Sequence, residues 1–179
     1  MTKIAISGHR HFSEKEQLRI AIQKVLGEII QTNPKKRMWL YSPLAEGADQ
    51  LAASIGLEFP KIKLVVPLPL SQEEYFKDFS TEEGKQEFHT LLGKANKVVE
   101  LPAMQDHKLA YQQLGAYLVK ECDVLVALWD GEGGKDSGGT GEVVEKARVS
   151  GRKIYWIYCE NGKKKSENGK RVGEIEVLN

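Results

Sequence analysis

Short apolar runs alternate with longer amphipathic stretches from one end of the chain to the other. The short runs are rich in β-branched and aromatic residues, which is typical of strands. They predict six strands, at residues 3–7, 38–42, 62–68, 97–101, 123–129 and 153–158. The stretches between them predict helices at residues 14–30, 46–57, 71–95 with an interruption near Gly84, 109–120 and 142–149.

The clearest helical pattern lies within residues 14–30, where the apolar positions fall on one face of a helix. These positions are Leu18, Ala21, Ile22, Val25, Leu26 and Ile29. Ser13 is followed three residues later by Glu16, so we expect a capping box at the start of this helix.

Strands that alternate with helices imply an α/β fold, a three-layer doubly wound Rossmann-like domain with a mainly parallel sheet of about six strands. The run at residues 123–129 is nearly all apolar, as expected of a central strand that is covered on both faces. After residue 160 the chain is polar, and a turn signal at Asn168-Gly169 allows a short edge strand. We expect one domain over residues 1–179, with its core at residues 3–158.

Composition and charge narrow the range of functions. Lys and Arg number 26 against 25 Asp and Glu, and this balance argues against a protein that clamps nucleic acid or an acidic membrane non-specifically. The two cysteines, Cys122 and Cys159, are too few for a disulfide framework and form no C-x-x-C pair. No apolar run is long enough for a signal peptide or a membrane span, so we expect a soluble, cytoplasmic protein without a membrane partner.

Candidate ligand-binding residues follow the first strand, because open parallel sheets bind ligands beyond the carboxyl ends of their strands. Gly8 permits a tight turn, and Arg10 offers a planar fork for a phosphate group at the positive end of the next helix. The simpler alternative is a plain turn with an exposed His-Arg-His cluster. Metal binding by His9 and His11 is disfavoured because no third ligand is near in the sequence.

The loop after the fifth strand carries the strongest signal, because six glycines occur within residues 131–141. Gly138, Gly139 and Thr140 lie just before a helix, where backbone N–H groups and a hydroxyl can meet an anion. The alternative is a flexible surface loop in which Thr140 caps the helix. The chain has no G-K-[ST], G-x-G-x-x-G, G-x-S-x-G or H-E-x-x-H motif.

After the second strand, Glu46 and Asp49 lie on either side of Gly47 at the start of a helix. Carboxylates at this position cap free N–H groups and suit the helix dipole. In the alternative, one of them faces the crevice and accepts hydrogen bonds from ribose hydroxyls. If the strand order reverses between the first and fifth strands, their loops lie side by side and form one pocket for a nucleotide phosphate.

Three of these segments together resemble the SLOG superfamily, which includes YpsA-like proteins, DNA-processing protein A and the LOG enzymes. The segments are Ser7-Gly8-His9-Arg10, the SPLAEGAD run at residues 42–49, and Asp130 with Gly138-Gly139-Thr140. The resemblance is closest to the YpsA-like branch, although Pro43 replaces a glycine. It implies a sensor or signalling domain that binds a nucleotide or nucleotide-derived ligand, and it allows a homodimer. We expect neither a cofactor nor a metal. The implied ligand-binding residues are Gly8, His9, Arg10, Glu46, Gly47, Asp49, Asp130, Gly138, Gly139, Thr140 and Glu142.

The LOG branch implies an alternative, the cleavage of the N-glycosidic bond of nucleoside 5′-monophosphates. Its signature resembles P-G-G-x-G-T-x-x-E, and this chain departs from it at Ser137 and Glu142 and lacks arginine in residues 109–120. In an enzyme of this kind, Glu142 or Glu145 would supply the catalytic carboxylate. A second alternative is single-stranded DNA binding like that of DNA-processing protein A, against which the charge balance argues.

Overall fold

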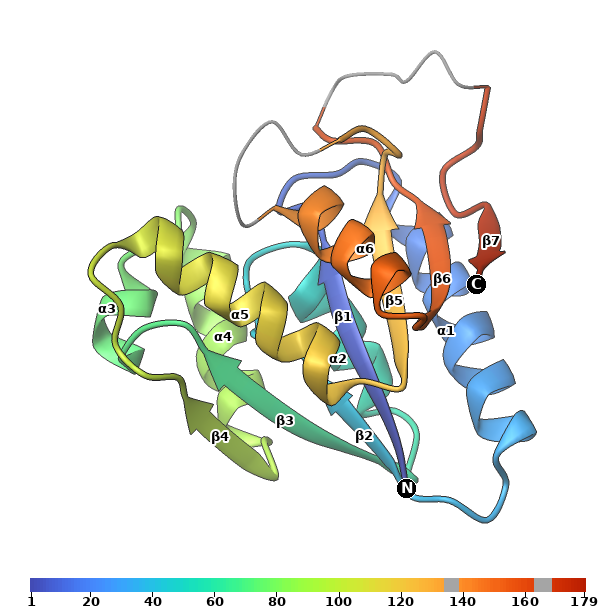
Figure 1. The fold of residues 1–179 in the computed structure, drawn as a ribbon, viewed down its shortest axis with the longest axis horizontal. Coiled ribbons are helices and arrows are strands. Elements are labelled where there is room, and N and C mark those ends of the chain that lie inside the picture. Colours follow the sequence, from blue (N-terminus) through green and yellow to red (C-terminus); the bar gives the residue numbers. More distant parts are fainter. Residues whose placement is uncertain (134–138, 163–168) are drawn as a thin grey trace.

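The computed structural model describes residues 1–133, 139–162 and 169–179, which form one seven-stranded sheet flanked by helices (Figure 1). The strand order is β4-β3-β2-β1-β5-β6-β7. The strands are β1 (Thr2–Gly8), β2 (Met38–Tyr41), β3 (Ile62–Leu68), β4 (Lys97–Glu100), β5 (Val124–Trp129), β6 (Lys153–Tyr158) and β7 (Ile175–Leu178). The helices are α1 (Lys15–Thr32), α2 (Ala48–Gly56), α3 (Gln72–Phe76), α4 (Glu82–Gly93), α5 (His107–Glu121) and α6 (Thr140–Val149).

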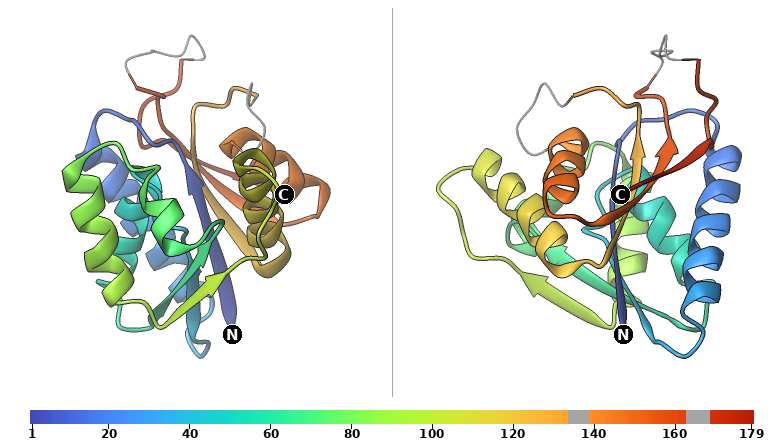
Figure 2. Two further views of the ribbon diagram at one scale, coloured as in Figure 1. Left: turned by 90° about the vertical axis from the view of Figure 1, so that its left-hand side faces the viewer. Right: turned by 45° about the vertical axis from the view of Figure 1, so that its right-hand side comes forward.

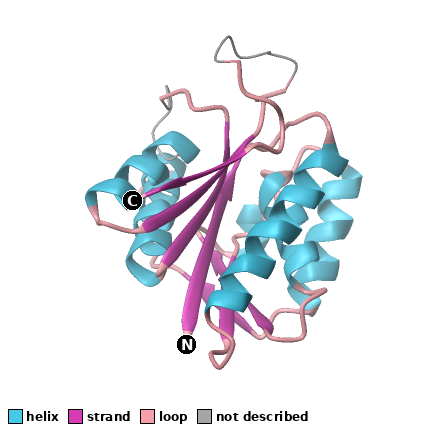
Figure 3. Cartoon of the chain, turned by 90° about the vertical axis from the view of Figure 1, so that its right-hand side faces the viewer, coloured by secondary structure: helices cyan, strands magenta, loops and turns pink. Residues whose placement is uncertain are grey.

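The helices cover both faces of the sheet and make three layers (Figure 3). One face packs against α1, α2 and α4, and the other packs against α5 and α6, as the left view of Figure 2 shows. The predicted apolar face of α1 is the buried one, because its six apolar positions are all in the core. The expected α/β, doubly wound, Rossmann-like fold is confirmed.

The strands follow the predicted pattern of burial. In β5 the four residues from Leu125 to Leu128 are fully buried, as expected of a strand inside the sheet. Strands β1 to β6 pair with one another in parallel, and β7 pairs antiparallel to β6 at the sheet edge. The short edge strand that the sequence allowed in the polar tail is therefore present.

The strand order reverses between β1 and β5. From β1 the chain builds the sheet in one direction through β2, β3 and β4, and then returns to add β5, β6 and β7 on the other side. Gly8, the last residue of β1, lies opposite Leu128 of β5. The carboxyl ends of these two strands are therefore neighbours, which confirms the arrangement on which the nucleotide-binding hypothesis depends.

One local prediction is wrong, and a second is confirmed with a small shift along the chain. The capping box at Ser13 does not form, because the N-cap of α1 is Glu14 in a left-handed conformation (φ 57°) without a side-chain cap bond. The interruption in the 71–95 region lies between α3 and α4, before Gly84, because the hydroxyl of Thr81 accepts a bond from the N–H of Gly84 and so caps α4.

Within the described part of the chain, no helix combines the length and the apolar character that crossing a membrane requires.

Candidate functional site

Close packing at Gly8 brings three elements together at the switch point. A Cβ atom on Gly8 would lie 2.5 Å from the Cβ of Ala48 in α2 and 2.8 Å from the Cβ of Leu128 in β5. Gly8 is therefore required for the close approach of α2 and β5 to β1, rather than for the turn that the sequence suggested. His9, the next residue, also links β1 to β5 and α2. Its N–H donates to the carbonyl of Leu128, and its carbonyl accepts from the N–H of Ala48.

A cavity of about 330 Å³ lies at this point, and we call it the switch-point cavity. Segments that follow β1, β2, β3 and β5 line it together with α5 and α6. Six of the predicted site residues are in its wall: Gly8, His9, Arg10, Asp49, Gly139 and Thr140. Other residues in its wall were not predicted, notably Tyr75, Tyr111 and Asn161.

The amino-terminal end of α6 reaches this cavity. Gly139 is the N-cap and Thr140 is the first helical residue, so the alternative in which Thr140 caps the helix is wrong. No side-chain cap bond is present at this end. Because the N–H groups of a first helical turn lack partners within the helix, this wall of the cavity presents the positive end of a helix dipole.

Asp49 lies in the same wall as a buried carboxyl group. Its side chain is 5% exposed, and its Oδ1 atom has no hydrogen-bond partner among the described residues. Burial raises the pKa of Asp49 to about 8, although the Arg10 charge and the N–H of Ala45 both act to lower it. A buried oxygen without a partner is rare in folded proteins, and it marks Asp49 as a candidate functional residue in this wall.

Tyr75 of α3 supplies a second buried oxygen of this kind. The side chain is fully buried, its hydroxyl has no partner in the described part of the chain, and it lines the same cavity. Burial raises the pKa of Tyr75 well above its usual value, and the charges of Tyr111 and Asp49 raise it further. The phenol is therefore neutral and keeps a proton to donate.

Arg10 is held in place at the cavity by two contacts. Its Nη1 donates to the carbonyl of Asp78 at 3.3 Å, and its Nη2 donates to the hydroxyl of Tyr111 at 3.1 Å. The Tyr111 hydroxyl in turn donates to Oδ2 of Asp78 at 2.6 Å. The guanidinium also lies 5.6 Å from the centre of the Tyr111 ring. These contacts fix a positive charge beside the cavity.

His9 joins the loop after β1 to the loop after β5. Its Nε2 atom accepts the backbone N–H of Asp130 at 3.1 Å, and Oδ1 of Asp130 lies 3.3 Å from the same atom. The Asp130 carboxylate also accepts the N–H of Glu132 at 3.0 Å. Asp130 does not line the switch-point cavity, and it contributes by holding these two loops together.

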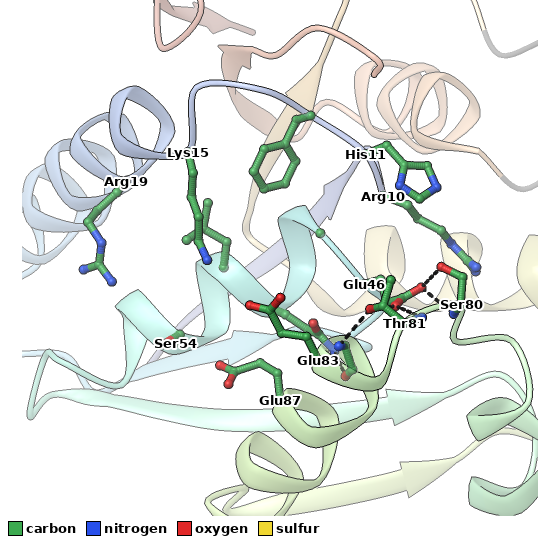
Figure 4. Close-up of a pocket in the computed structure, with 15 residues that line it drawn as sticks. Arg10, His11, Lys15, Arg19, Glu46, Ser54, Ser80, Thr81, Glu83 and Glu87 are labelled. Carbon is green, nitrogen blue, oxygen red and sulfur yellow. Dashed lines mark hydrogen bonds between the residues drawn. The ribbon is translucent and has the colours of Figure 1, made fainter. Parts of the chain in front are cut away.

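Glu46 is committed to a structural contact. Its carboxylate accepts four hydrogen bonds, from the backbone N–H and the hydroxyl of both Ser80 and Thr81 (Figure 4). Burial raises the pKa of Glu46, but these four bonds outweigh it and lower the pKa to about 2. Glu46 therefore ties the start of α2 to the start of α4.

Gly47, the N-cap of α2, adopts a backbone conformation (φ 90°) that favours glycine. A Cβ atom on Gly47 would overlap the backbone of Arg10, so this glycine lets the loop after β2 approach the loop after β1. Gly47 does not line the switch-point cavity, and its contribution is this close approach.

Glu46 and Gly47 line a second cavity of about 360 Å³, which we call the α2–α4 cavity. Figure 4 shows Lys15 and Arg19 on one side of it and Glu83 and Glu87 on the other. Arg10 lines both cavities.

Neither carboxylate that the hydrolase alternative requires lines the switch-point cavity. Oε1 of Glu142 lies 2.6 Å from Nζ of Lys146, and Glu145 is exposed and lines a separate apolar groove beside Val149. Gly138 lies outside the described residues. Among the described residues, Asp49 is the one acidic side chain in the wall of the cavity.

Tyr75 could have been found from the chain order. The third predicted strand ends at a Pro-Leu-Pro stop, so the segment after it lies at the same edge of the sheet as the other loops. The sequence pattern predicts this segment as a helix and does not show which of its side chains reach the crevice.

No group of three or more His, Cys, Asp or Glu side chains in the described ranges is placed to hold a metal ion. The polar side chains that line the switch-point cavity are instead hydroxyls, two imidazoles, one amide, one carboxyl group and one guanidinium, and apolar side chains complete its wall. This donor set suits a polar ligand that carries both an anionic group and neutral hydroxyl or amide groups.

No family model and no curated protein matches the chain. Among solved structures, the chain is similar to the X-ray structure of TM1055, a structural genomics target. The two share 15% sequence identity with a TM-score of 0.50, and the alignment covers 85% of this chain and 71% of that one. This likeness extends over most of the sheet and its helices, and the chain therefore has a Rossmann-like α/β fold.

Proposed function

We propose that this protein binds a nucleotide or nucleotide-derived ligand in the switch-point cavity and acts as a sensor or signalling domain of the SLOG type. The observation that carries the proposal is that the amino-terminal end of α6, Asp49 and Tyr75 all line the same cavity. The amino-terminal end of α6 provides a site for an anion, and the buried oxygens of Asp49 and Tyr75 have no partner within the described chain.

The position and size of the cavity support this proposal. The crevice at the point of strand reversal is where doubly wound folds bind nucleotides. Its volume of about 330 Å³ falls in the range of small-molecule sites, which begins at about 300 Å³. The Arg10 guanidinium, fixed by Tyr111 and Asp78, adds a positive charge suited to a phosphate group.

The glycosidase alternative would require a different carboxyl group from the one that the sequence suggested. Glu142 and Glu145 are absent from the cavity wall, whereas Asp49 is part of it. If the ligand is cleaved, Asp49 is the acidic residue placed to act on it. Incubation with nucleoside 5′-monophosphates followed by assay for free base tests this alternative, and release that persists in Asp49→Asn would contradict the role of Asp49.

The binding proposal is tested by a thermal-shift screen against nucleotides, followed by calorimetry on each compound that stabilises the protein. A ligand at 100 times its Kd should stabilise the fold by about 2.7 kcal/mol. We expect Arg10→Ala and Thr140→Val each to remove most of this stabilisation, because both side chains line the switch-point cavity.

Matched controls are Arg19→Ala and Thr90→Val. Arg19 lines only the α2–α4 cavity, and Thr90 is exposed on α4. Both controls should keep the full response to ligand. A complete absence of nucleotide binding, or an equal response in Arg10→Ala, Thr140→Val and the controls, would contradict the proposed site.

A further inference from the structure

The proposed function does not use the α2–α4 cavity. With a volume of about 360 Å³, this cavity is slightly larger than the switch-point cavity and falls in the range of small-molecule sites. Its wall is formed by the loop after β1 and the start of α1, by α2, and by the first turns of α4 with the residues before them. The cavity is therefore a concave space between three helices.

Unpaired charges of opposite sign lie on facing sides of this cavity. Lys15 of α1 lies on one side, and Glu83 and Glu87 of α4 lie on the other (Figure 4). None of these three side chains makes a hydrogen bond or an ion pair with any other described residue. Their charges are therefore available to a ligand that enters the cavity.

The other charged side chains in the wall already have partners. Nη1 of Arg19 donates to Oε1 of Glu58 at 2.7 Å. Arg10 is held by its contacts beside the switch-point cavity, and the Glu46 carboxylate accepts four hydrogen bonds from the start of α4. The three unpaired charges therefore determine which ligand fits.

The side of the cavity that carries the carboxylates is rigid. The four bonds of Glu46 connect α2 to the start of α4, and Nε2 of Gln50 donates to the carbonyl of Gly84 at 2.8 Å. A Cβ atom on Gly84 would overlap the Glu46 side chain, so the two helices approach closely at this point. Glu83 and Glu87 therefore project from a fixed helix, which lowers the entropic cost of binding.

The balance of charge selects the class of ligand. Lys and Arg side chains number three in the wall and Glu side chains also number three: Arg10, Lys15 and Arg19, and Glu46, Glu83 and Glu87. A ligand with one sign of charge would be attracted by one side and repelled by the other, whereas a ligand with both signs is attracted by both. Phe12 and Leu51 add apolar surface to the same wall.

A bound metal ion fits this cavity less well. Within the described ranges, no group of three or more metal-ligating side chains is placed to hold one. Lys15 would also repel a metal cation that lies between it and the two glutamates.

We propose that the α2–α4 cavity binds a small zwitterion of the amino-acid or dipeptide class. Its carboxylate pairs with Lys15, and its ammonium group pairs with Glu83 and Glu87. These three residues line this cavity and not the switch-point cavity, so the inference does not depend on the proposed nucleotide-binding function.

The test measures the Kd of the standard amino acids and of glycine-containing dipeptides by calorimetry, at ligand concentrations up to the millimolar range. Each compound that binds is then compared with its N-acetyl derivative, which lacks the positive charge, and with its carboxamide, which lacks the negative one. We expect each derivative to bind at least about tenfold more weakly, because one charge-assisted hydrogen bond is lost.

Two variants assign the two ends of the ligand. Lys15→Met keeps most of the side chain but removes its charge, so it should abolish the preference for the free carboxylate over the carboxamide. Glu83→Gln combined with Glu87→Gln should abolish the preference for the free ammonium group over the N-acetyl form. Lys24→Met and Glu73→Gln are the matched controls, since both residues are exposed outside the cavity wall, and both preferences should remain.

The outcomes separate this inference from the proposed function. Failure of every zwitterion to bind, or equal affinity for the blocked derivatives, would overturn the inference. Preferences that stay unchanged in both Lys15→Met and the Glu83→Gln, Glu87→Gln double variant would overturn the assignment to this cavity. None of these results bears on nucleotide binding, which the same variants should retain because the substituted residues do not line the switch-point cavity.

Discussion

Asp49 destabilises the free protein at neutral pH. Burial raises its pKa from 3.8 to about 8, so between these two values the unfolded chain ionises while the folded chain keeps its proton. The unfolded state then binds fewer protons than the native state, and the free energy of unfolding therefore falls as the pH rises from about 4 to 8. Below pH 4 both states are protonated and this effect disappears.

The replacement Asp49→Asn should therefore stabilise the protein in the absence of ligand. The gain should be on the order of a few kcal/mol at pH 7.5 and much smaller at pH 4.5. Urea unfolding of both proteins at the two pH values measures it. Glu83→Gln, which replaces an exposed carboxylate, should show no comparable pH-dependent gain. If the gain for Asp49→Asn is the same at both pH values, the buried carboxyl is not the cause.

The different roles of Glu46 and Asp49 could not be separated from the sequence. Both lie near the start of α2, and either could have faced the crevice or bonded to free N–H groups. The choice depends on the α3–α4 connection, whose Ser80 and Thr81 provide four donors to Glu46. That partner is more than thirty residues away in the chain, and local spacing carries no information about it.

At the scale of elements, the sequence predicted the strands more closely than the ends of the helices. β3 and β6 have the predicted bounds, because apolar runs end where the chain leaves the sheet. The start of α1 was misplaced because Ser13 and Glu16 fit a capping pattern that the backbone at Glu14 does not adopt. Tyr75 was not predicted as a site residue because α3 is short, and whether Tyr75 lines the cavity depends on how this segment packs against the rest of the fold.

The contact between α2 and α4 gives the second stability prediction. Glu46→Gln should destabilise the protein by about 1–3 kcal/mol at pH 7, because an amide nitrogen would replace an acceptor that faces N–H and O–H donors. The pKa of Glu46 is lowered from 4.5 to about 2, so its stabilising effect is complete above pH 4.5 and is lost as the pH falls towards 2. The difference between the two proteins should shrink over that interval.

Chemical denaturation at pH 7 and at pH 3 measures this difference, and Glu87→Gln on the same cavity wall is the control. Glu87 makes no hydrogen bond or ion pair in the described chain, so its replacement should change the free energy of unfolding little. A loss of stability for Glu46→Gln that is equal at both pH values would mean that the hydrogen bonds to the carboxylate are not responsible.

At the scale of the whole molecule, packing far from the cavity determines the shape of the site. Three apolar clusters fill the molecule, one on each face of the sheet and a third around β3, α3 and α4. Tyr75 belongs to the third cluster and is also one of the residues that line the switch-point cavity. We therefore expect a loss of packing in this cluster to displace Tyr75 and so to weaken ligand binding.

Phe88→Leu tests this connection. Phe88 is fully buried against Tyr75 and lines neither the switch-point cavity nor the α2–α4 cavity. Loss of the aromatic contact should destabilise the fold by about 1 kcal/mol or more and weaken the binding of a ligand that bonds to Tyr75. Ile22→Val in α1 should cost a similar amount, about 0.5–1.5 kcal/mol, without weakening binding, because Ile22 belongs to the first cluster. Calorimetric Kd values and unfolding free energies for Phe88→Leu and Ile22→Val separate the loss of stability from the weakening of ligand binding. If the two variants weaken binding equally, general loss of stability, and not the position of Tyr75, controls the site.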